Sequence, residues 1–285
     1  MNFFGLKRRI NKLFGGFSRT SAVFKRQYYE TLRNESRNKT ALRLSGYGYK
    51  VYSQSDEDGI IAEIFRRIGF TNKYFVEIGV GDGLENNTAA LLQCGWRGLW
   101  IEASENYFNK INEGMSRLIK NGQLILVNEF ATPENIDKLI SLGGEKGEID
   151  LLSLDIDGED AHVLENITVV SPRVLVIEYN AKFGPSIRFC MDRRTKNSWG
   201  DVKSDNFGAS LKYFEEMLHK KGYKLVGCNI AGTNAFFVRS DLVGENFEAP
   251  HTSEHHFEPA RYELTDLPSG HPSSYRSFDF VDFSK

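Results

Sequence analysis

Glycines alternate with other residues directly after a short apolar segment, in the stretch Tyr-Phe-Val-Glu-Ile-Gly-Val-Gly-Asp-Gly at 74–83. An acid, Glu77, precedes the glycines, and a second apolar segment at 98–102 ends in Glu102. A strand, a turn that a ligand can approach closely and an acid at the end of the next strand together form half of a nucleoside site, in which the acid binds ribose hydroxyls. These residues therefore predict a bound nucleoside cofactor.

The spacing of the glycines distinguishes between two such cofactors. They stand at 79, 81 and 83, whereas a dinucleotide-binding turn would place its third glycine at Leu84. The Glu-x-Gly-x-Gly-x-Gly pattern that begins at Glu77 resembles the first motif of class I S-adenosylmethionine-dependent methyltransferases. Its acid suits the cationic amino end of a methionine moiety better than a pyrophosphate. S-adenosyl-L-methionine is the expected cofactor, and the expected binding residues are Glu77, Gly79, Gly81, Gly83, Glu102, Asn128 and Asp155.

A second group of polar residues follows two further apolar segments. The segment 149–155 continues into Asp155-Ile-Asp157-Gly-Glu-Asp, and the segment 173–179 ends in Glu178-Tyr-Asn180. Open α/β sheets bind ligands at the carboxyl ends of their strands, and these two strand ends are neighbours in the usual strand order. Carboxylate and amide oxygens suit Mg²⁺ or Mn²⁺. We expect a metal site with the ligands Asp155, Asp157, Glu178 and Asn180.

The chemistry expected at this second group is activation of a hydroxyl. A hydroxyl is a poor nucleophile near neutral pH, so it needs a base or a cation before it attacks a sulfonium methyl group. Metal-dependent O-methyltransferases of the catechol type have similar acids after strands four and five, although Glu178 and Asn180 are not consecutive here. The alternative without a metal assigns the base to Asp157 or His162. A third interpretation makes the acids an ordinary turn and helix N-terminus.

The elements that position these residues form a regular alternation of strands and helices. Apolar runs predict strands at 74–79, 98–102, 123–128, 149–155, 173–179, 223–229 and 235–239. A first helix follows the N-cap residues at 53–58 and ends at Gly69, and later helices are predicted at 87–94, 105–120, 133–142, 159–166 and 209–221. Such strands indicate a parallel sheet covered on both faces. The order resembles the Rossmann-like class I methyltransferase fold, an α/β fold with a seven-stranded, mostly parallel sheet and helices on both faces.

Three regions are expected along the chain: a basic amphipathic extension at 1–45, a methyltransferase domain at 46–244 and a polar tail without clear elements at 245–285. The extension is typical of a helix that packs on protein or lies on an anionic membrane surface. The segment 181–206 lacks periodicity, and a loop this long is usually functional or disordered. Together with the tail it is expected to select the methyl acceptor.

Composition excludes several other classes of protein. The chain is 40% apolar and 26% charged, as in soluble globular proteins, and its formal charge of −2 provides no general attraction for nucleic acid. Its three cysteines show neither a disulfide framework nor metal-ligand spacing, which fits a reducing compartment. We find no bilayer-spanning apolar run and no signal-peptide core. The expected location is cytoplasmic, with peripheral membrane contact through the N-terminal segment as an alternative, and the oligomeric state is left open.

Three segments carry a resemblance to one methyltransferase family. The stretch from Ile149 to Asn166 is similar to the Asp-x-Glu-Gly-x-Glu signature of FkbM-type methyltransferases, and Pro172–Glu178 and 222–239 also resemble that family. The chain departs from the signature at Asp157 and in the Glu-Tyr-Asn after strand five. The resemblance implies O-methylation of a hydroxyl on a glycan or related small metabolite. In the cofactor site itself, the end of strand three (Asn128 or Glu129) is expected to face the adenine. The competing hypotheses are an NAD-type oxidoreductase and a non-catalytic binding protein with the same fold.

Overall fold

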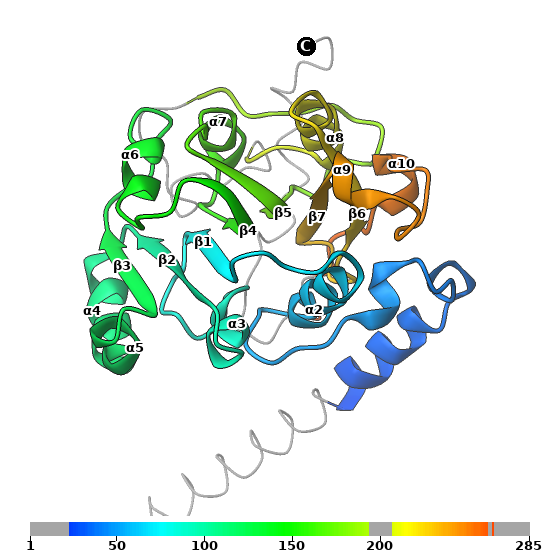
Figure 1. Ribbon diagram of the computed structural model, residues 1–285. Helices are drawn as coiled ribbons and strands as arrows, with labels where there is room; N and C mark the ends of the chain where they lie inside the picture. Colours follow the sequence, from blue (N-terminus) through cyan, green and yellow to red (C-terminus); the bar gives the residue numbers. More distant parts are fainter. Residues whose placement is uncertain (1–22, 194–206, 262–263, 265–285) are drawn as a thin grey trace, which may run out of the picture.

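A seven-stranded sheet forms the centre of the protein (Figure 1). The computed structural model describes residues 23–193, 207–261 and 264. The strands are β1 (Tyr74–Ile78), β2 (Arg97–Glu102), β3 (Leu124–Asn128), β4 (Gly147–Leu154), β5 (Val170–Glu178), β6 (Tyr223–Cys228) and β7 (Asn234–Arg239). Their order is β3-β2-β1-β4-β5-β7-β6, and β7 runs antiparallel to both of its neighbours. The predicted fold class, a Rossmann-like class I methyltransferase fold, is confirmed.

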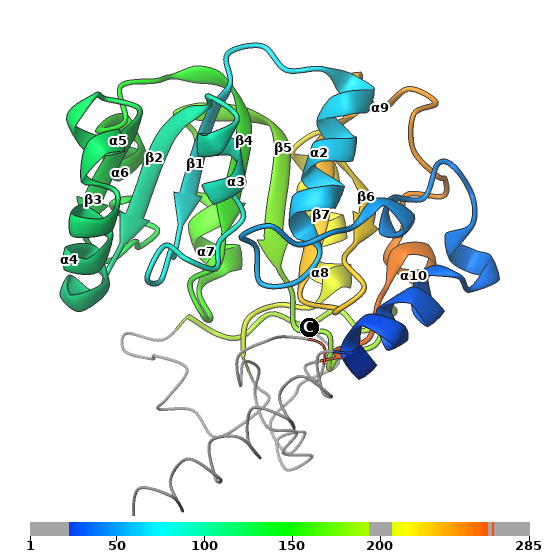
Figure 2. The same cartoon turned by 90° about the horizontal axis from the view of Figure 1, so that it is seen from below.

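The order of the parallel strands reverses between β1 and β4. Strand β1 pairs with β2 on one side and with β4 on the other, both in parallel. The carboxyl ends of these strands therefore meet at one edge of the sheet, which lies on the lower side in Figure 2. Ligands of open α/β sheets bind at such a reversal point, outside the carboxyl ends of the strands.

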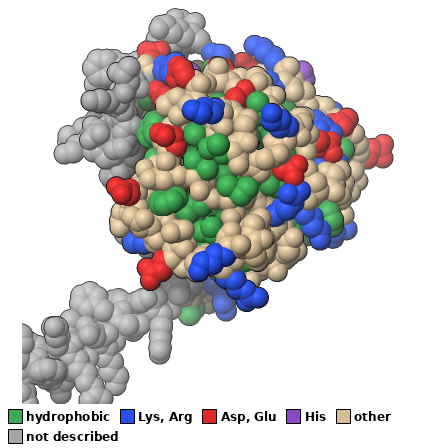
Figure 3. Space-filling view, turned by 60° about the vertical axis from the view of Figure 1, so that its left-hand side comes forward, with side chains coloured by type: hydrophobic (Ala, Val, Ile, Leu, Met, Phe, Trp, Pro, Cys, Tyr) green, Lys and Arg blue, Asp and Glu red, His purple; other side chains and the backbone are tan. Residues whose placement is uncertain are grey.

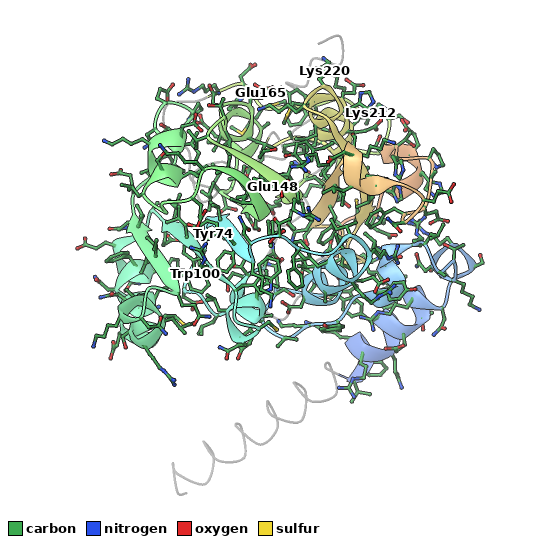
Figure 4. All side chains as sticks on the ribbon, viewed as in Figure 1. Tyr74, Trp100, Glu148, Glu165, Lys212 and Lys220 are labelled. Atoms are coloured by element: carbon green, nitrogen blue, oxygen red, sulfur yellow. The ribbon has the colours of Figure 1, made fainter. Side chains whose placement is uncertain are left out.

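Helices cover both faces of the sheet because successive strand side chains point to opposite sides. One face carries α2 (Glu57–Ile68), α3 (Ala89–Gln93), α4 (Glu105–Gly114) and α5 (Ser116–Lys120). The other carries α6 (Ile136–Ser141), α7 (Asp160–Glu165) and α8 (Leu211–Lys220). Tyr74 packs on the side of α6, α7 and α8, and Trp100 packs on the side of α2, α3 and α4. Figure 4 shows both residues within the layered core. Their polar atoms are also satisfied, since Tyr74 donates to the Gly143 carbonyl and Trp100 to the Thr88 hydroxyl.

The helix predicted at 105–120 is interrupted. Helix α4 ends at Gly114 and α5 begins at Ser116. Between them Met115 has φ −101° and ψ 15°, outside the helical region, and its N–H bonds to the Ile111 carbonyl at 2.7 Å. Glycine is a weak helix former, which explains why the helix breaks next to Gly114.

The segment before the sheet is joined to the core. Residues 23–33 form a helix, followed by the short 3₁₀ helices η1 (Ser36–Asn38) and η2 (Leu44–Tyr47). Leu44 is completely buried and belongs to the same hydrophobic cluster as α2 and α3. The amphipathic pattern at 3–17 lies outside the described residues. The domain boundary at 45/46 stays a prediction, but residues just before it already contribute to the core.

The segment after β7 contains structure that was not expected. Two short helices, α9 (Ser240–Val243) and α10 (Ser253–His256), follow the sheet. Beyond α10, Glu258 is buried and pairs with Arg37 and Arg261. Phe247 is also buried against the core, so isolated apolar residues and one paired acid hold a segment whose overall polar composition gave no sign of packing.

The side of the molecule shown in Figure 3 carries charged side chains of both signs, interspersed with apolar ones. Among the described residues, large apolar side chains are exposed at Tyr107 in α4, at Phe130 after β3 and at Leu142 after α6. No helix in the described part of the chain has both the length and the apolar character needed to cross a bilayer.

Candidate active site

The glycine turn after β1 occupies the reversal point. Gly79 has φ +82°, and a Cβ atom there would lie 1.6 Å from the Asp155 carbonyl oxygen, so the end of β1 needs glycine to lie against the end of β4. Gly81 has φ +62°, but a Cβ atom there would meet nothing within 4 Å. Gly83 has φ +77°, and a Cβ atom there would lie 3.1 Å from Ile111 and 3.2 Å from Trp100. The turn is thus packed at both ends and open at its middle residue.

Glu102, at the end of β2, fixes this turn. Its carboxylate accepts a hydrogen bond from the Gly81 N–H at 2.8 Å and another from the Ser104 N–H at 2.7 Å. The side chain is 6% exposed. Each carboxylate oxygen has a second acceptor position, because a carboxylate offers about four in all. The structure therefore places Glu102 beside the open part of the turn, where the ribose was expected.

Asn128, at the end of β3, ties the neighbouring strand end to β2. Its Nδ2 donates to the carbonyls of Glu102 at 2.8 Å and Ala103 at 3.2 Å. The Glu129 N–H also bonds to the Glu102 carbonyl at 3.2 Å. Phe130, the next residue, is 57% exposed at this edge. The expected adenine side of the site thus combines a fixed strand end with an exposed aromatic ring.

Glu77 has a different role from the expected contact with a methionine amino group. It is buried, and its carboxylate accepts hydrogen bonds from the Asn86 amide, the N–H groups of Asn87 and Thr88, and the Thr88 hydroxyl. Burial raises the pKa of Glu77, and these hydrogen bonds oppose that effect. Glu77 therefore anchors the loop after the glycine turn to β1, because its position inside the strand points its side chain into the protein.

Sequence reasoning missed the partners of Glu77. The run Asn86-Asn87-Thr88 connects Glu77 to β2 and β4, since Thr88 accepts from the Trp100 indole at 2.7 Å and Asn87 donates to the Ser153 hydroxyl at 3.0 Å. The signal in the sequence that could have revealed these partners is the run of three consecutive polar residues before an apolar helix. Their burial, between 0 and 8% exposed, depends on residues distant in sequence.

Three of the four predicted metal ligands lie together. Carboxylate oxygens of Asp155, Asp157 and Glu178 are all within 4.8 Å of one another, and the first two side chains are exposed. Desolvation and then repulsion between the acids raise the pKa of Asp155 and Glu178 well above its usual range. The same effects raise the pKa of Asp157 to about 6. Because Asp155 and Asp157 retain exposed surface, we attribute the direction of these shifts chiefly to crowded negative charge.

The backbone holds Asp155, Asp157 and Glu178, which we call the acid group, in place. Asp157 has φ +58°, a conformation that is uncommon for residues other than glycine and often marks functional sites. Asp160 closes the turn by accepting from the N–H groups of Ile156 at 2.8 Å and Gly158 at 3.0 Å. The hydrogen bonds of Asp160 therefore fix the backbone on both sides of Asp157, and this fixed backbone sets the direction of the Asp157 side chain.

The composition of the acid group fits a divalent cation. Three carboxylates from two adjacent strand ends supply hard oxygen donors, and Mg²⁺ needs only one or two of them, with water and substrate completing its shell. A cation would also offset the repulsion that raises their pKa values. Asp155, Asp157 and Glu178 are the residues that would hold it.

The remaining predicted residues bond elsewhere. The Asn180 amide donates to the Phe207 carbonyl at 2.8 Å and its oxygen accepts from the Lys182 N–H at 3.1 Å, so it organises the loop after β5. His162 contacts the Met191 carbonyl through Nε2 at 3.0 Å, which joins α7 to the segment that follows β5. Residues 194–206 of the predicted acceptor loop lie outside the described residues.

Comparisons with known proteins return methyltransferases among solved structures. The magnesium protoporphyrin IX methyltransferase ChlM from Synechocystis PCC 6803, solved with SAH, is 14% identical over 65% of this chain and 81% of its own, with a TM-score of 0.43. A SAM-dependent methyltransferase from Aquifex aeolicus is 11% identical over 74% of this chain and 95% of its own, with a TM-score of 0.38. The SAH-bound N-terminal domain of EvdMO1 is 14% identical over 67% and 88%, with a TM-score of 0.41.

No family model matches the chain, and no curated protein sequence matches it. The fold assignment rests on the strand order and register of this protein itself.

Proposed function

We propose that this protein is an S-adenosylmethionine-dependent O-methyltransferase. The observation that supports the proposal most directly is the meeting of two groups at the reversal point of the sheet: the glycine turn with Glu102, and the acids that follow β4 and end β5. The first suits an adenosine and the second suits activation of a hydroxyl. Neither group alone would distinguish this activity from other uses of the fold.

The ribose, the adenine and the sulfonium of the cofactor each have a counterpart at this edge. Glu102 accepts the ribose hydroxyls with its remaining acceptor positions, and the open space beside Gly81 admits the ligand. Asn128 and the exposed Phe130 flank the adenine side. The sulfonium is a cation, so a location near Asp155 and Asp157 is electrostatically favourable.

The transfer is a single displacement. The acceptor oxygen forms a bond to the methyl carbon while the carbon–sulfur bond breaks, and sulfur keeps the electron pair and leaves as the neutral thioether. The hydroxyl proton passes to a carboxylate of the acid group, and Asp157 is the best placed because it is exposed and fixed by its turn. A divalent cation held by Asp155, Asp157 and Glu178 would lower the pKa of the hydroxyl.

The acceptor that we propose is a hydroxyl of a glycan or related small metabolite. Its support is the resemblance of Ile149–Asn166 to the FkbM-type signature. Methyl transfer to a panel of sugars, polysaccharide fragments and catechols tests this part separately from the cofactor.

The experiment that tests the activity is calorimetric titration of the full chain with S-adenosylmethionine, S-adenosylhomocysteine and NAD. Binding of the first two and not of NAD supports the proposal. Binding of NAD alone would establish the oxidoreductase alternative, and binding of none of the three would leave a non-catalytic protein.

A further inference from the structure

A pocket opens at the carboxyl edge of the sheet, outside the acid group. It has a volume of about 370 Å³ and lies between the helix at 23–33 and the loop at 49–56, with Leu264 at its border. Four cations line it, namely Lys25, Arg26, Arg33 and Lys50. We call this cavity the basic pocket.

The basic pocket adjoins the proposed cofactor turn. Lys50 pairs with Glu85 at 2.9 Å, and Glu85 follows the glycine turn by two residues. In Figure 2 the helix at 23–33, in dark blue, lies on the same lower side as the carboxyl ends of β1 and β5. An acceptor that occupied the pocket would therefore approach the edge where methyl transfer is proposed.

A buried hydrogen-bond network extends from the pocket wall toward the end of β5. Ser55, in the pocket wall, accepts from the Asn229 amide at 2.9 Å, and Glu57 accepts from the Asn234 amide at 3.0 Å. Asn234 is paired with Glu178 across β7 and β5. The network thus reaches from the pocket wall to β7, the strand next to the one that ends in Glu178, and its side chains are buried.

The charge of the pocket favours an anion. Its four cations face two acids of the lining, Glu30 and Asp56, and Lys50 also pairs with Glu85 outside the lining, so the cations still outnumber the acids. Glu30 pairs with Arg33 at 3.1 Å but is itself 57% exposed. Asp56 is buried, and desolvation together with Glu57 raises its pKa to about 7, so its negative charge is reduced at neutral pH.

Arg33 also has hydrogen-bonding capacity left over. Its Nη1 bonds to Glu30, while its Nε is buried without a hydrogen-bond partner. A buried N–H without a partner is costly unless a ligand satisfies it. A guanidinium binds oxyanions through two parallel N–H groups, so a phosphoryl or carboxylate group is the natural complement.

The loop that carries Tyr49 and Lys50 is held rigidly. One oxygen of Asp58 accepts from the N–H groups of Val51, Tyr52 and Ser53 at 2.6, 2.7 and 2.8 Å. Tyr49 is nevertheless 50% exposed. A fixed, exposed aromatic ring beside a cationic pocket can pack on the ring of a ligand whose charged group enters the pocket.

We propose that the basic pocket binds the oxyanion of the methyl acceptor, so that the acceptor is an anionic, ring-containing small molecule. Arg33 and Lys50 contact the phosphoryl or carboxylate oxygens, and Tyr49 packs against the adjacent ring. This inference rests on the proposed methyltransferase function and narrows its substrate class.

Calorimetric titration of the full chain at constant ionic strength tests the proposal. The probes are pyrophosphate and glucose 1-phosphate for phosphoryl groups, and glucuronate for a carboxylate. The double variant Arg33→Gln, Lys50→Gln is compared with Arg66→Gln, whose arginine also pairs with a glutamate three residues earlier but is 69% exposed on α2, outside the pocket. We expect at least one probe to bind, with affinity reduced about tenfold or more in the double variant and unchanged in Arg66→Gln.

Absence of binding by all three probes, or equal affinities in the double variant and the control, would overturn the proposal. Thermal unfolding of each variant identifies any that fail to fold, and the single variant Arg33→Lys, which keeps the charge, replaces the double variant in that event. S-adenosylmethionine is titrated into the same samples. If it binds while the anions do not, only the basic pocket is misassigned; if it does not bind either, the proposed function fails as well.

Discussion

The Gly81 N–H donates a hydrogen bond of 2.8 Å to Oε2 of Glu102. One residue lies in the turn after β1 and the other at the end of β2, so this bond sets the distance between the two halves of the proposed cofactor site. A change to either partner is expected to alter both the shape of the turn and the contacts to the ribose.

Replacement of Glu102 by alanine is expected to abolish cofactor binding while the protein remains folded. The variant loses the brace of the turn and the ribose hydrogen bonds, each of which contributes about 1.5–3 kcal/mol when the acceptor is charged. Calorimetric titration with S-adenosylhomocysteine measures the loss. Glu113→Ala removes an exposed acid from α4 and serves as the control; equal affinities in the two variants would contradict the assignment.

Gly79 and Gly81 should respond differently to alanine although both have positive φ. At Gly81 the added methyl meets open space, so the cost is that of the backbone conformation, about 1–2 kcal/mol. At Gly79 it would also meet the Asp155 carbonyl 1.6 Å away, so the expected destabilisation is above about 3 kcal/mol. Denaturant unfolding measures both, and similar losses would show that the ends of β1 and β4 are not in contact as described.

Asp157→Asn and Glu178→Gln are expected to reduce turnover by about 10²–10⁴-fold and to leave cofactor affinity nearly unchanged. The adenosine contacts lie on β1, β2 and β3, whereas these acids lie at the ends of β4 and β5. The assay is methyl transfer with and without a chelator, followed by addition of Mg²⁺ or Mn²⁺. Full activity in the presence of chelator would show that transfer needs no metal. Full activity of both variants would falsify the assignment of the acid group as the reactive site.

His162→Gln should retain turnover. The ring contacts the Met191 carbonyl, and a glutamine amide can replace that contact. A loss of turnover with an unchanged thermal midpoint would instead restore His162 as the base, and the pH dependence of turnover in the two proteins would reveal which group titrates.

The pKa of His256 leads to a prediction of how the stability of the protein depends on pH. Burial lowers the pKa of His256 to about 3, against about 6.5 for the unfolded chain. The unfolded state therefore takes up a proton that the native state does not, so stability falls as the pH drops from about 6.5 to about 3, by up to about 1.36 kcal/mol per pH unit. His256→Gln, whose amide can still donate to the Glu248 carbonyl that His256 Nε2 contacts at 3.1 Å, should flatten this part of the curve. Parallel curves for the two proteins between pH 4 and 7 would contradict a neutral buried ring.

The sequence predicted the sheet well because its signals are local. Each parallel strand is an apolar run bounded by a glycine or an acid, and Glu102 and the acids after β4 follow directly from where those runs end. The roles of individual polar residues were harder to predict. Glu77 and Asn180 have the right types at the right places, but their bonding is decided by Asn86, Thr88 and Lys182, which no periodicity specifies.

The basic pocket could not have been predicted by the same approach. It combines Arg33 and Lys50 with Leu264, which are far apart in the chain, and its charge depends on the burial of Asp56. Hydrophobic periodicity identifies elements and faces, whereas a pocket between irregular segments depends on how those segments pack.

Arg43 links the segment before the sheet to the segment after it. Its guanidinium is buried and bonds to Glu248 and to the His255 carbonyl, about two hundred residues later in the chain. During synthesis this cation emerges long before its partners do. The corner of the molecule that it occupies must therefore be among the last to become native, and a nascent chain that stops before Glu248 lacks the counter-charge that this corner requires.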